Sequence, residues 1–441
     1  MGRGTGVKPL IAKQTVRSAL SAHAAIGLLA SALLYLVCVT GTLVVFYQEW
    51  QRVEQPSAPE MTAISPEAVQ KSVTTLLASE AGHAPSTHLY VQLPYGGLPR
   101  TAVITDDQAM NVAPDGTLAG AQEKGWSEFL LNLHYRLMLP ATWGLIIVGA
   151  LGVVMVALSI TGVLAHPRIF RDAFRLRARQ GSGVGLADWH NRLSVWTLPF
   201  SLAVALTGAV IGLAGVTSYG LGKQFYDGDT LAAYTPIFGG EPKPDHAVGP
   251  VPDMAAALRG MKRRFPYADP YYVIVHDPLT AGQHIQILAH IPHRLIYGES
   301  YSFDAAGRFR KKAGMSDGAL GKQAAASNYN LHFGNFGGLP VKIAYLIFGA
   351  ALCAIIGTGP VLWLGKRRRR GMHEPKLRAA WNAVLWGIPA MLAATLVLRL
   401  IAGNAAPLNA VFWIGMAAIL LVSITRAGLR DKRARESLQP A

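Results

Sequence analysis

The sequence is poor in charged residues and in cysteine. Asp, Glu, Lys and Arg make up 15% of the 441 residues, whereas ordinary soluble domains carry about 25%. Apolar residues make up 51%, which argues against a purely cytosolic enzyme. Cys38 and Cys353 are the two cysteines, and both lie in apolar segments. The sequence therefore offers neither a disulfide framework nor a cluster of thiolate ligands.

Six windows that contain no charged residue are long enough to cross a bilayer. Crossing the hydrocarbon requires roughly 20 apolar residues, and an apolar segment of this length satisfies its backbone hydrogen bonds as a helix. We therefore predict six transmembrane helices. The windows cover residues 18–48, 137–167, 193–222, 343–365, 379–398 and 400–425.

The distribution of the net charge of +16 along the chain indicates membrane orientation rather than nucleic-acid binding. Four segments beside the apolar windows hold 21 Lys and Arg against 5 Asp and Glu, whereas the two long loops hold 17 against 20. Basic segments remain in the cytoplasm, so we predict that both termini lie inside and both loops outside. The basic segments are 1–20, 167–188, 365–380 and 426–441, and the loops are 48–136 and 218–330.

The first and third predicted helices carry the same spaced motif. His23 near the start of the first is followed 17 residues later by Thr40-Gly41, and His190 in the third is followed 17 residues later by Thr207-Gly208. One helix pattern thus occurs twice.

The second and fourth predicted helices repeat another motif. Asn-Leu-His occurs at His134 and again at His332, and Thr161-Gly162 and Thr358-Gly359 follow these histidines after 27 and 26 residues. Residues 20–170 and 187–366 are therefore interpreted as two copies of a helix–loop–helix unit. Parallel repeats of this kind favour a pseudo-two-fold axis along the membrane normal.

The two long loops also resemble each other in their predicted elements. Each combines one amphipathic helix with several extended segments and a turn, so each is expected to form a small helix-plus-sheet module that leans on its neighbour. The first loop is predicted to contain a helix over 66–80, strands over 87–93 and 100–105, and a turn at 115–116. The second is predicted to contain a helix over 252–264, strands over 271–275, 284–289 and 300–304, and a turn near 307.

Histidines at the membrane edges of the repeated helices carry the predicted chemistry. Neutral imidazole is an axial ligand of b-type haem, and one histidine from each of two facing helices is sufficient for a bis-ligated iron. The pseudo-two-fold axis would pair His134 with His332 near the outer face and His23 with His190 near the inner face. We therefore predict two haem b groups, bound non-covalently because no Cys-x-x-Cys-His motif occurs.

Two features of this hypothesis have more than one interpretation. His166 has no counterpart in the second repeat, so it is either a helix-dipole or phosphate partner or the inner ligand in place of His23. The four Thr-Gly pairs indicate close helix packing or contact with a flat porphyrin. Pro140 and the glycines after His332 are expected to bend the chain there, which would let each outer histidine turn inward.

Several stretches resemble the PepSY-associated transmembrane-helix family. One is LSITGVLAHPRIFRD over residues 158–172, and another combines DWHN over 188–191 with LPF over 198–200. In the first half, TGTL over 40–43 with EW at 49–50, and Leu133-His134 before Pro140, are similar to the same family. The resemblance covers about residues 20–366, so the helices of windows 379–398 and 400–425 are additional and are assigned a structural role.

The resemblance implies a function in iron metabolism. The family includes bacterial iron-regulated inner-membrane proteins and periplasmic siderophore reductases, so it implies PepSY-like loops in the periplasm and haem b held by transmembrane histidines. It also implies that this chain is a ferric-chelate reductase of the bacterial inner membrane, acting on a ferric siderophore or similar chelate. Because the short cytoplasmic loops contain no flavin or nicotinamide fingerprint, a quinone or a separate dehydrogenase is expected to supply the electrons.

Together these patterns predict an α-helical membrane protein with six transmembrane helices, the first four as a duplicated unit, and two α+β PepSY-like periplasmic modules. The predicted segments are the N-terminus with the first helix (1–47), the first module (48–133), the second helix (134–168), a cytoplasmic linker (169–187), the third helix (188–217), the second module (218–330), the fourth helix (331–366), a basic cytoplasmic loop (367–378), the fifth and sixth helices (379–428) and a cytoplasmic tail (429–441).

Two other classes of function are compatible with parts of the pattern. A haem-free transporter subunit would use the repeat for alternating access, and it predicts discontinuous helices. A signalling or protease-regulating membrane protein would use the exterior modules as binding domains, and its histidines would be replaceable without loss of function.

Overall fold

The computed structural model describes residues 12–166, 168–172, 184–232, 235, 244–313 and 318–437. The chain divides into two compact units, which we call the helical unit and the sheet unit. The helical unit comprises Met1–Val45, Gly125–Leu213 and Leu339–Ala441, and the sheet unit comprises Phe46–Lys124 and Ala214–Gly338. Most of the predicted linker 169–187 lies outside the described residues.

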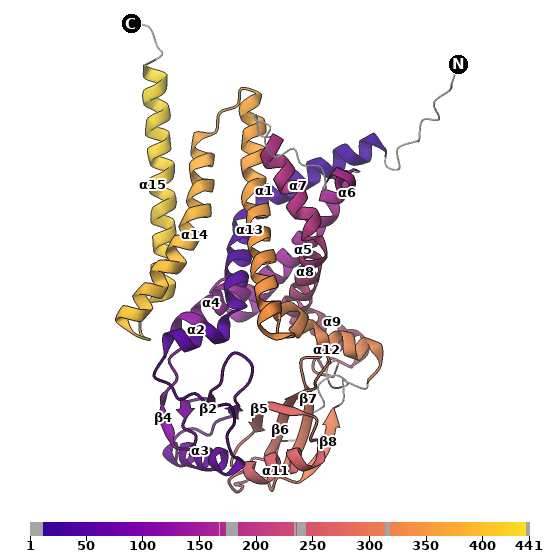
Figure 1. The fold of residues 1–441 in the computed structure, drawn as a ribbon, viewed down its shortest axis with the longest axis vertical. Helices are drawn as coiled ribbons and strands as arrows, with labels where there is room; N and C mark the ends of the chain where they lie inside the picture. Colours follow the sequence, from indigo (N-terminus) through magenta and orange to yellow (C-terminus); the bar gives the residue numbers. More distant parts are fainter. Residues whose placement is uncertain are drawn as a thin grey trace, which may run out of the picture. The chain divides into compact units, whose positions relative to one another are not determined.

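Five helices in the described part of the chain are long and apolar enough to cross a membrane. They are α1 (Lys13–Val44), α5 (Ala141–Ala165), α13 (Gly338–Arg369), α14 (Pro375–Ala402) and α15 (Leu408–Glu436). Figure 1 shows them as the long coils of the ribbon. The short helices α4 (Gly125–Arg136) and α6 (Ile169–Asp172) accompany them.

The third predicted span is a broken helix. Helices α7 (Val184–Trp196) and α8 (Leu198–Gly212) meet at an angle of 65°, and they make a sixth candidate span only if they are taken together. Pro199 lies in the first turn of α8, where its missing N–H leaves no intrahelical bond unmade. The sequence predicted six transmembrane helices, and the described residues contain five candidate spans, or six if α7 and α8 form one. Thr197 ends α7, and Pro199 favours the start of α8.

Small residues allow α5 and α8 to pack closely within the helical unit. A Cβ added to Gly149 would lie 2.9 Å from the backbone of Gly212, and one added to Gly152 would lie 2.9 Å from the carbonyl oxygen of Ala205. Glycine and alanine at such positions are typical of helix interfaces in membranes, where close van der Waals contact drives association.

The sheet unit contains all eight described strands and five helices. The strands are β1 (His88–Gln92), β2 (Thr101–Ile104), β3 (Ala109–Val112), β4 (Leu118–Ala121), β5 (Asp269–His276), β6 (His284–His290), β7 (Glu299–Asp304) and β8 (Phe309–Ala313). The helices are α2 (Tyr47–Glu54), α3 (Pro66–Ser79), α9 (Ala214–Phe225), α11 (Met254–Arg264) and α12 (Leu320–Phe333).

The eight strands form one antiparallel sheet in the order β4-β3-β2-β1-β5-β6-β7-β8. Strand β1 of the first loop pairs with β5 of the second, with Val91 opposite Val273 and Leu89 opposite Val275. The expected two modules are therefore halves of a single sheet. Pairing β1 with β5 satisfies the backbone groups that each half would otherwise expose at its edge.

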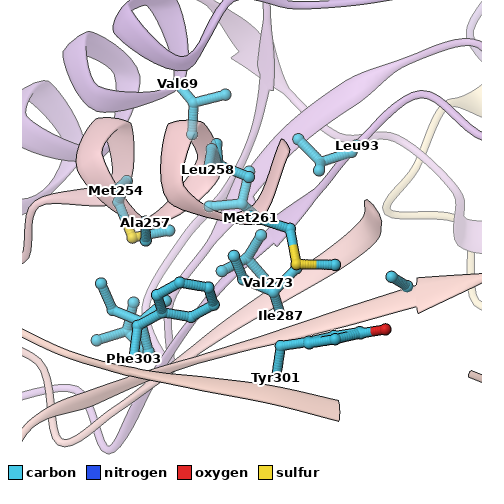
Figure 2. Close-up of a cluster of buried hydrophobic side chains, with 14 of the residues drawn as sticks. Val69, Leu93, Met254, Ala257, Leu258, Met261, Val273, Ile287, Tyr301 and Phe303 are labelled. Carbon is cyan, nitrogen blue, oxygen red and sulfur yellow. The ribbon is translucent and has the colours of Figure 1, made fainter. Parts of the chain in front are cut away.

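Helices α3 and α11 cover the same face of this sheet (Figure 1) and share one core with it. Val69 of α3 and Leu258 and Met261 of α11 are buried in one cluster (Figure 2). The cluster includes strand residues from both halves, among them Val91 of β1 and Val273 of β5. Because the apolar side chains of the two loops enter one cluster, the loops are expected to fold as one cooperative unit.

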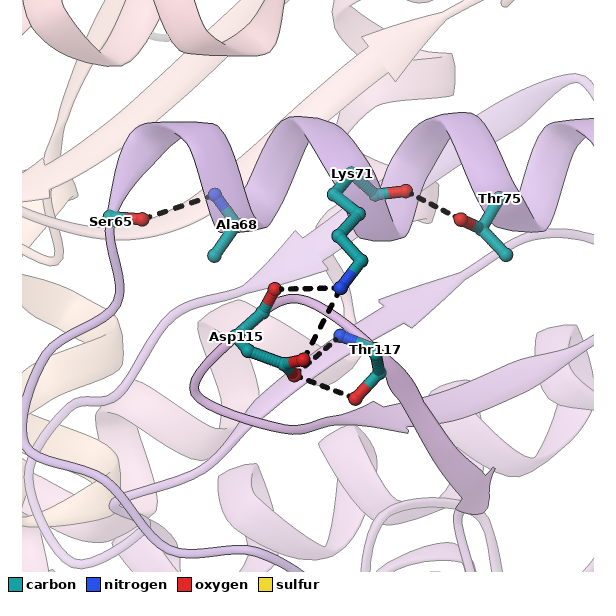
Figure 3. A network of polar contacts seen from close by, with 6 residues as sticks. All are labelled: Ser65, Ala68, Lys71, Thr75, Asp115 and Thr117. Atoms are coloured by element: carbon teal, nitrogen blue, oxygen red, sulfur yellow. Dashed lines mark hydrogen bonds and ion pairs between the residues drawn. The ribbon is translucent and has the colours of Figure 1, made fainter.

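A polar network fixes the β3–β4 turn to helix α3 (Figure 3). The Asp115 carboxylate accepts hydrogen bonds from the Thr117 hydroxyl at 2.6 Å and the Thr117 backbone N–H at 3.0 Å. Lys71 of α3 donates to the same carboxylate at 3.3 Å and to the Asp115 carbonyl at 3.1 Å. Ser65 caps the start of α3 by accepting from the Ala68 N–H at 3.1 Å. The network therefore connects the hairpin to the helix that covers it.

This network predicts an acid-sensitive contribution to stability. Hydrogen bonds from Thr117, followed by that from Lys71, lower the pKa of Asp115 to about 2. A carboxyl group whose pKa is depressed on folding stabilises the protein above its unfolded pKa of about 3.9 and loses that contribution as the pH falls toward about 2. We expect Asp115→Asn to lower the melting temperature at about pH 5, and we expect the difference from wild type to shrink as the pH falls through about 2, measured by circular dichroism in detergent.

Thr117→Val, which removes one donor to the carboxylate, should reproduce part of the Asp115→Asn effect. A difference between Asp115→Asn and wild type that stays constant across this pH range would contradict the assignment of the effect to the Asp115 carboxylate.

Candidate functional site

His23 of α1 contacts α5 at its Thr-Gly pair. Its Nδ1 lies 3.0 Å from the Leu158 carbonyl oxygen and 3.3 Å from the Thr161 hydroxyl. Because a carbonyl oxygen only accepts, Nδ1 must carry the proton and donate it. The Thr161 hydroxyl donates to the Ala157 carbonyl at 2.7 Å, so its lone pairs also face the imidazole.

His134 of α4 makes the same contact with α1. Its Nδ1 donates to the Val37 carbonyl oxygen at 3.0 Å and lies 3.4 Å from the Thr40 hydroxyl. Thr40 is fully buried, and its hydroxyl donates to the Leu36 carbonyl at 2.8 Å. In both cases the carbonyl that accepts the hydrogen bond from the imidazole lies three residues before the threonine.

His190 of α7 contacts the third Thr-Gly pair, on α13. Its Nδ1 lies 2.9 Å from the Thr358 hydroxyl, and the ring also interacts with the backbone carbonyl of Ile355. The Thr358 hydroxyl donates to the Ala354 carbonyl at 2.8 Å, so Thr358 accepts from His190. His23 and His190 thus each contact the Thr-Gly pair of a different helix, and their pairing with each other stays a prediction.

These shared contacts determine which nitrogen of each ring can bind a metal. Donation from Nδ1 to the partner helix fixes the neutral tautomer and places the lone pair on Nε2. A histidine that ligates iron commonly donates its other ring N–H to a carbonyl, which orients the ring and increases its basicity. In this tautomer Nε2 of His23, His134 and His190 is the atom that could bind a metal, and neutral imidazoles of this kind fit a haem iron.

The glycines beside the threonines leave room for the imidazoles. A Cβ added to Gly41 would lie 2.6 Å from His134 Cε1, and one added to Gly162 would lie 3.3 Å from His23 Cε1. At Gly359 an added Cβ would meet no atom within 4 Å. Close approach of helix and ring thus explains Gly41 and Gly162 and gives each Thr-Gly pair of the first half a definite partner.

His332 and His166 are the other two predicted site residues. His332 is half-buried at the end of α12 in the sheet unit, where its ring meets Phe333 edge to face at 5.6 Å. Its pairing with His134 stays a prediction. His166 is exposed at the C-terminal end of α5, one turn beyond Gly162, where a basic side chain can interact favourably with the helix dipole.

The backbone changes direction directly after each predicted outer histidine. After His134, Leu137 and Met138 have φ angles of 55° and 60°, an uncommon left-handed conformation for side chains of this size. After His332, Gly334 ends α12 with φ 69°, and Gly338 begins α13 with φ 64°. Both histidines therefore lie on short helices that are separate from the long helices which follow.

Three loop histidines form a row on the sheet. His88, His276 and His284 lie opposite one another on β1, β5 and β6. The rings of His276 and His284 are stacked at 4.3 Å with an interplanar angle of 1°. Because the lone pairs of parallel rings do not converge on one ion, we interpret this row as ring packing rather than as a metal site.

The sequence interpretation did not assign the threonines a role as acceptors for histidine. The spacing of 17 residues from histidine to Thr-Gly relates positions on one helix, whereas the contacts join different helices. The information was present in the repeated helices, which carry four repeated histidines and four Thr-Gly pairs.

The fold and these contacts define the chain as a multi-pass membrane protein with oriented histidines at its helix ends. The chain belongs to the PepSY-associated transmembrane family, because the PepSY-associated TM region matches residues 20–366. It is also similar to an uncharacterized protein of Pseudomonas aeruginosa, with 26% identity over 273 residues. That match covers 54% of this chain and 64% of the length of the relative.

Proposed function

We propose that the protein is a haem b-containing oxidoreductase of the bacterial inner membrane that passes electrons outward to reduce a ferric siderophore or similar ferric chelate in the periplasm. The observation that carries the proposal is the donation from Nδ1 of His23, His134 and His190 to the helix that each of them faces. Three histidines that make the same kind of contact, on three different helices, are better explained by binding of a cofactor than by packing alone.

The predicted duplication supplies an acceptor for the fourth histidine, His332. Thr207 is the remaining threonine of the Thr-Gly pairs, and the repeat assigns it to His332 as Thr40 is assigned to His134. The proposal thus places His134 and His332 at an outer haem and His23 and His190 at an inner one. A porphyrin supplies four equatorial nitrogens, so two imidazoles complete the coordination of each iron.

The residues of this chain would bind, orient and shield the cofactor. The donating contacts hold each imidazole in one tautomer, the glycines permit close approach, and the apolar helices exclude water. When bound, haem b supplies one-electron redox chemistry. Reduction of Fe(III) to Fe(II) consumes one electron for each ferric ion, and we propose a quinol or a separate dehydrogenase as the donor.

The proposed orientation follows from the charge pattern. Both termini and the basic run from Lys366 to Arg370, at the end of α13, would lie in the cytoplasm by the positive-inside rule. The sheet unit would then lie in the periplasm, where a chelate can reach it.

One observation favours a second candidate. The break between α7 and α8 is a discontinuous helix, which the haem-free transporter subunit predicts. His190 lies on the α7 side of this break, so the same break can also present an imidazole.

A reduced-minus-oxidised visible spectrum of the purified full-length protein separates these functions. We expect the α-band of a b-type haem and about two haems per chain by pyridine haemochrome analysis. In proteoliposomes containing a quinol, a ferric chelate added outside should be reduced. Protein that is purified from haem-replete cells without any haem would contradict the proposal and favour the transporter or signalling class.

A further inference from the structure

Helices α14 and α15 lie beyond residues 20–366, which the family match covers. They pack against each other (Figure 1), with Gly415 of α15 directly against the Met391 side chain of α14. Apart from each other, α14 and α15 mainly contact α1 and α4, the helices that carry His23 and His134.

The outer contacts of this hairpin hold α4, the helix that carries His134. The Trp126 Nε1–H donates to the Thr395 hydroxyl at 3.1 Å in a buried contact. The Thr395 hydroxyl donates in turn to the Leu392 carbonyl at 2.8 Å. Thr395 therefore accepts from α4 while its own proton is bound within α14.

The connection between α14 and α15 caps the start of α4. The Gly125 N–H donates to the Asn404 side-chain oxygen at 2.9 Å, which satisfies one of the amides that every helix leaves unpaired at its N-terminus. Phe129 of α4 also packs edge to face on Phe412 of α15 at 5.8 Å. On its His134 side, α4 contacts α1. Helix α4 is thus held from both sides.

Another part of α14 contacts α13 next to Thr358, the acceptor of His190. The Trp381 Nε1–H donates to the Gly357 carbonyl at 3.0 Å in a buried contact, and Gly357 directly precedes Thr358. Trp381 also packs edge to face on Tyr35 of α1, whose hydroxyl donates to the Leu385 carbonyl at 3.1 Å. Helix α14 therefore contacts the chain beside both proposed ligand pairs.

We infer that the α14–α15 hairpin is a brace that sets the orientation of the proposed haem ligands, with Thr395 as a positioning residue for His134 and Trp381 as one for His190. This inference rests on the proposed function for its redox consequence. The two residues act on different ligands, so their effects are separable.

The test is a pair of substitutions, each of which is expected to affect a different haem. Thr395→Val removes the acceptor of Trp126 at nearly constant volume, and it should shift the midpoint potential and the low-spin EPR signal of the outer haem while leaving the inner haem unchanged. Trp381→Phe keeps an aromatic ring but removes the indole N–H, and it should shift only the inner haem. Thr395→Ser retains the hydroxyl and should restore wild-type values.

A second measurement does not depend on haem. Hydrogen exchange over residues 125–136 of the haem-free full-length protein should become roughly 2- to 12-fold faster in Thr395→Val, as expected for the loss of one buried hydrogen bond. Asn404→Ala provides an independent variant with the same expectation if Thr395→Val does not fold. Exchange and outer-haem signals that are unchanged in the variants would overturn the brace.

The two failures are distinguishable. Absence of haem from wild-type protein would contradict the proposed function, whereas the exchange measurement would still decide whether the hairpin orders α4. Equal shifts of both haems in both variants would show general loosening of the bundle and would overturn the separate roles of Thr395 and Trp381.

Discussion

Replacing His190 or His134 by alanine is expected to remove one haem from each chain, lowering the haem content from about two to about one. Each substitution deletes an imidazole whose Nδ1 contact fixes its tautomer, so the iron would lose an axial ligand. Pyridine haemochrome analysis of the purified variants measures the change directly. Ferric-chelate reduction in proteoliposomes should fall to background in both variants.

His166→Ala is the matched control for these variants. His166 is exposed at the end of α5, so its removal should leave the haem content at about two. Retention of haem in His23→Ala together with its loss in His166→Ala would instead identify His166 as the inner ligand in place of His23 and contradict the pairing of His23 with His190.

A graded loss of haem affinity is expected when the glycines beside the threonines are enlarged to alanine. Gly41→Ala would place a methyl group 2.6 Å from His134 Cε1, which requires the ring to move. Overpacking of this kind costs about 1–3 kcal/mol, which corresponds to a roughly 5- to 150-fold weaker outer site. Gly162→Ala, with 3.3 Å to His23 Cε1, should have a smaller effect on the inner site.

Gly359→Ala is the control for this series, since its added methyl group would meet no atom within 4 Å. All three substitutions replace glycine by alanine beside a threonine in a long helix, so differences among them report the local contact. Haem titration of the apoprotein provides the affinities. Equal affinities in Gly41→Ala and Gly359→Ala would contradict the close approach of His134 to α1.

The elements of the sheet unit were largely predictable from the sequence. Ser65 before Pro66 marks the start of α3, and period-two alternation around Val91 and Ile285 indicates β1 and β6. Strand β8 was missed because its Arg310-Lys311-Lys312 segment is polar and at the sheet edge, where charged residues protect an exposed strand. Strand β4 was also missed, because it contains Gly120 and is mostly exposed.

The union of the two loops into one sheet could not be predicted from either loop alone. Nothing in the alternating pattern of β1 specifies whether its outer edge meets solvent or another strand, because the pattern reports only the faces of a sheet. The similarity of the loops indicated two modules, whereas the pairing of Val91 with Val273 joins them.

The candidate site was predictable in its residues more than in its geometry. Spacing identified His23, His134 and His190, whereas the helix that each ring contacts is known only from the structure. The break at Thr197 could not be read from hydropathy, because both α7 and α8 contribute to one apolar window and Pro199 was the single local signal.

The β1–β5 seam has a consequence for biosynthesis. Strand β1 leaves the ribosome long before β5, since the chain between Gln92 and Asp269 must first be made and its helices inserted into the bilayer. Until then the nascent first loop presents an uncovered strand edge and half of a core. Maturation of the extramembrane part is therefore tied to late translation, and a truncated product ending before Asp269 would be a substrate for quality-control proteases.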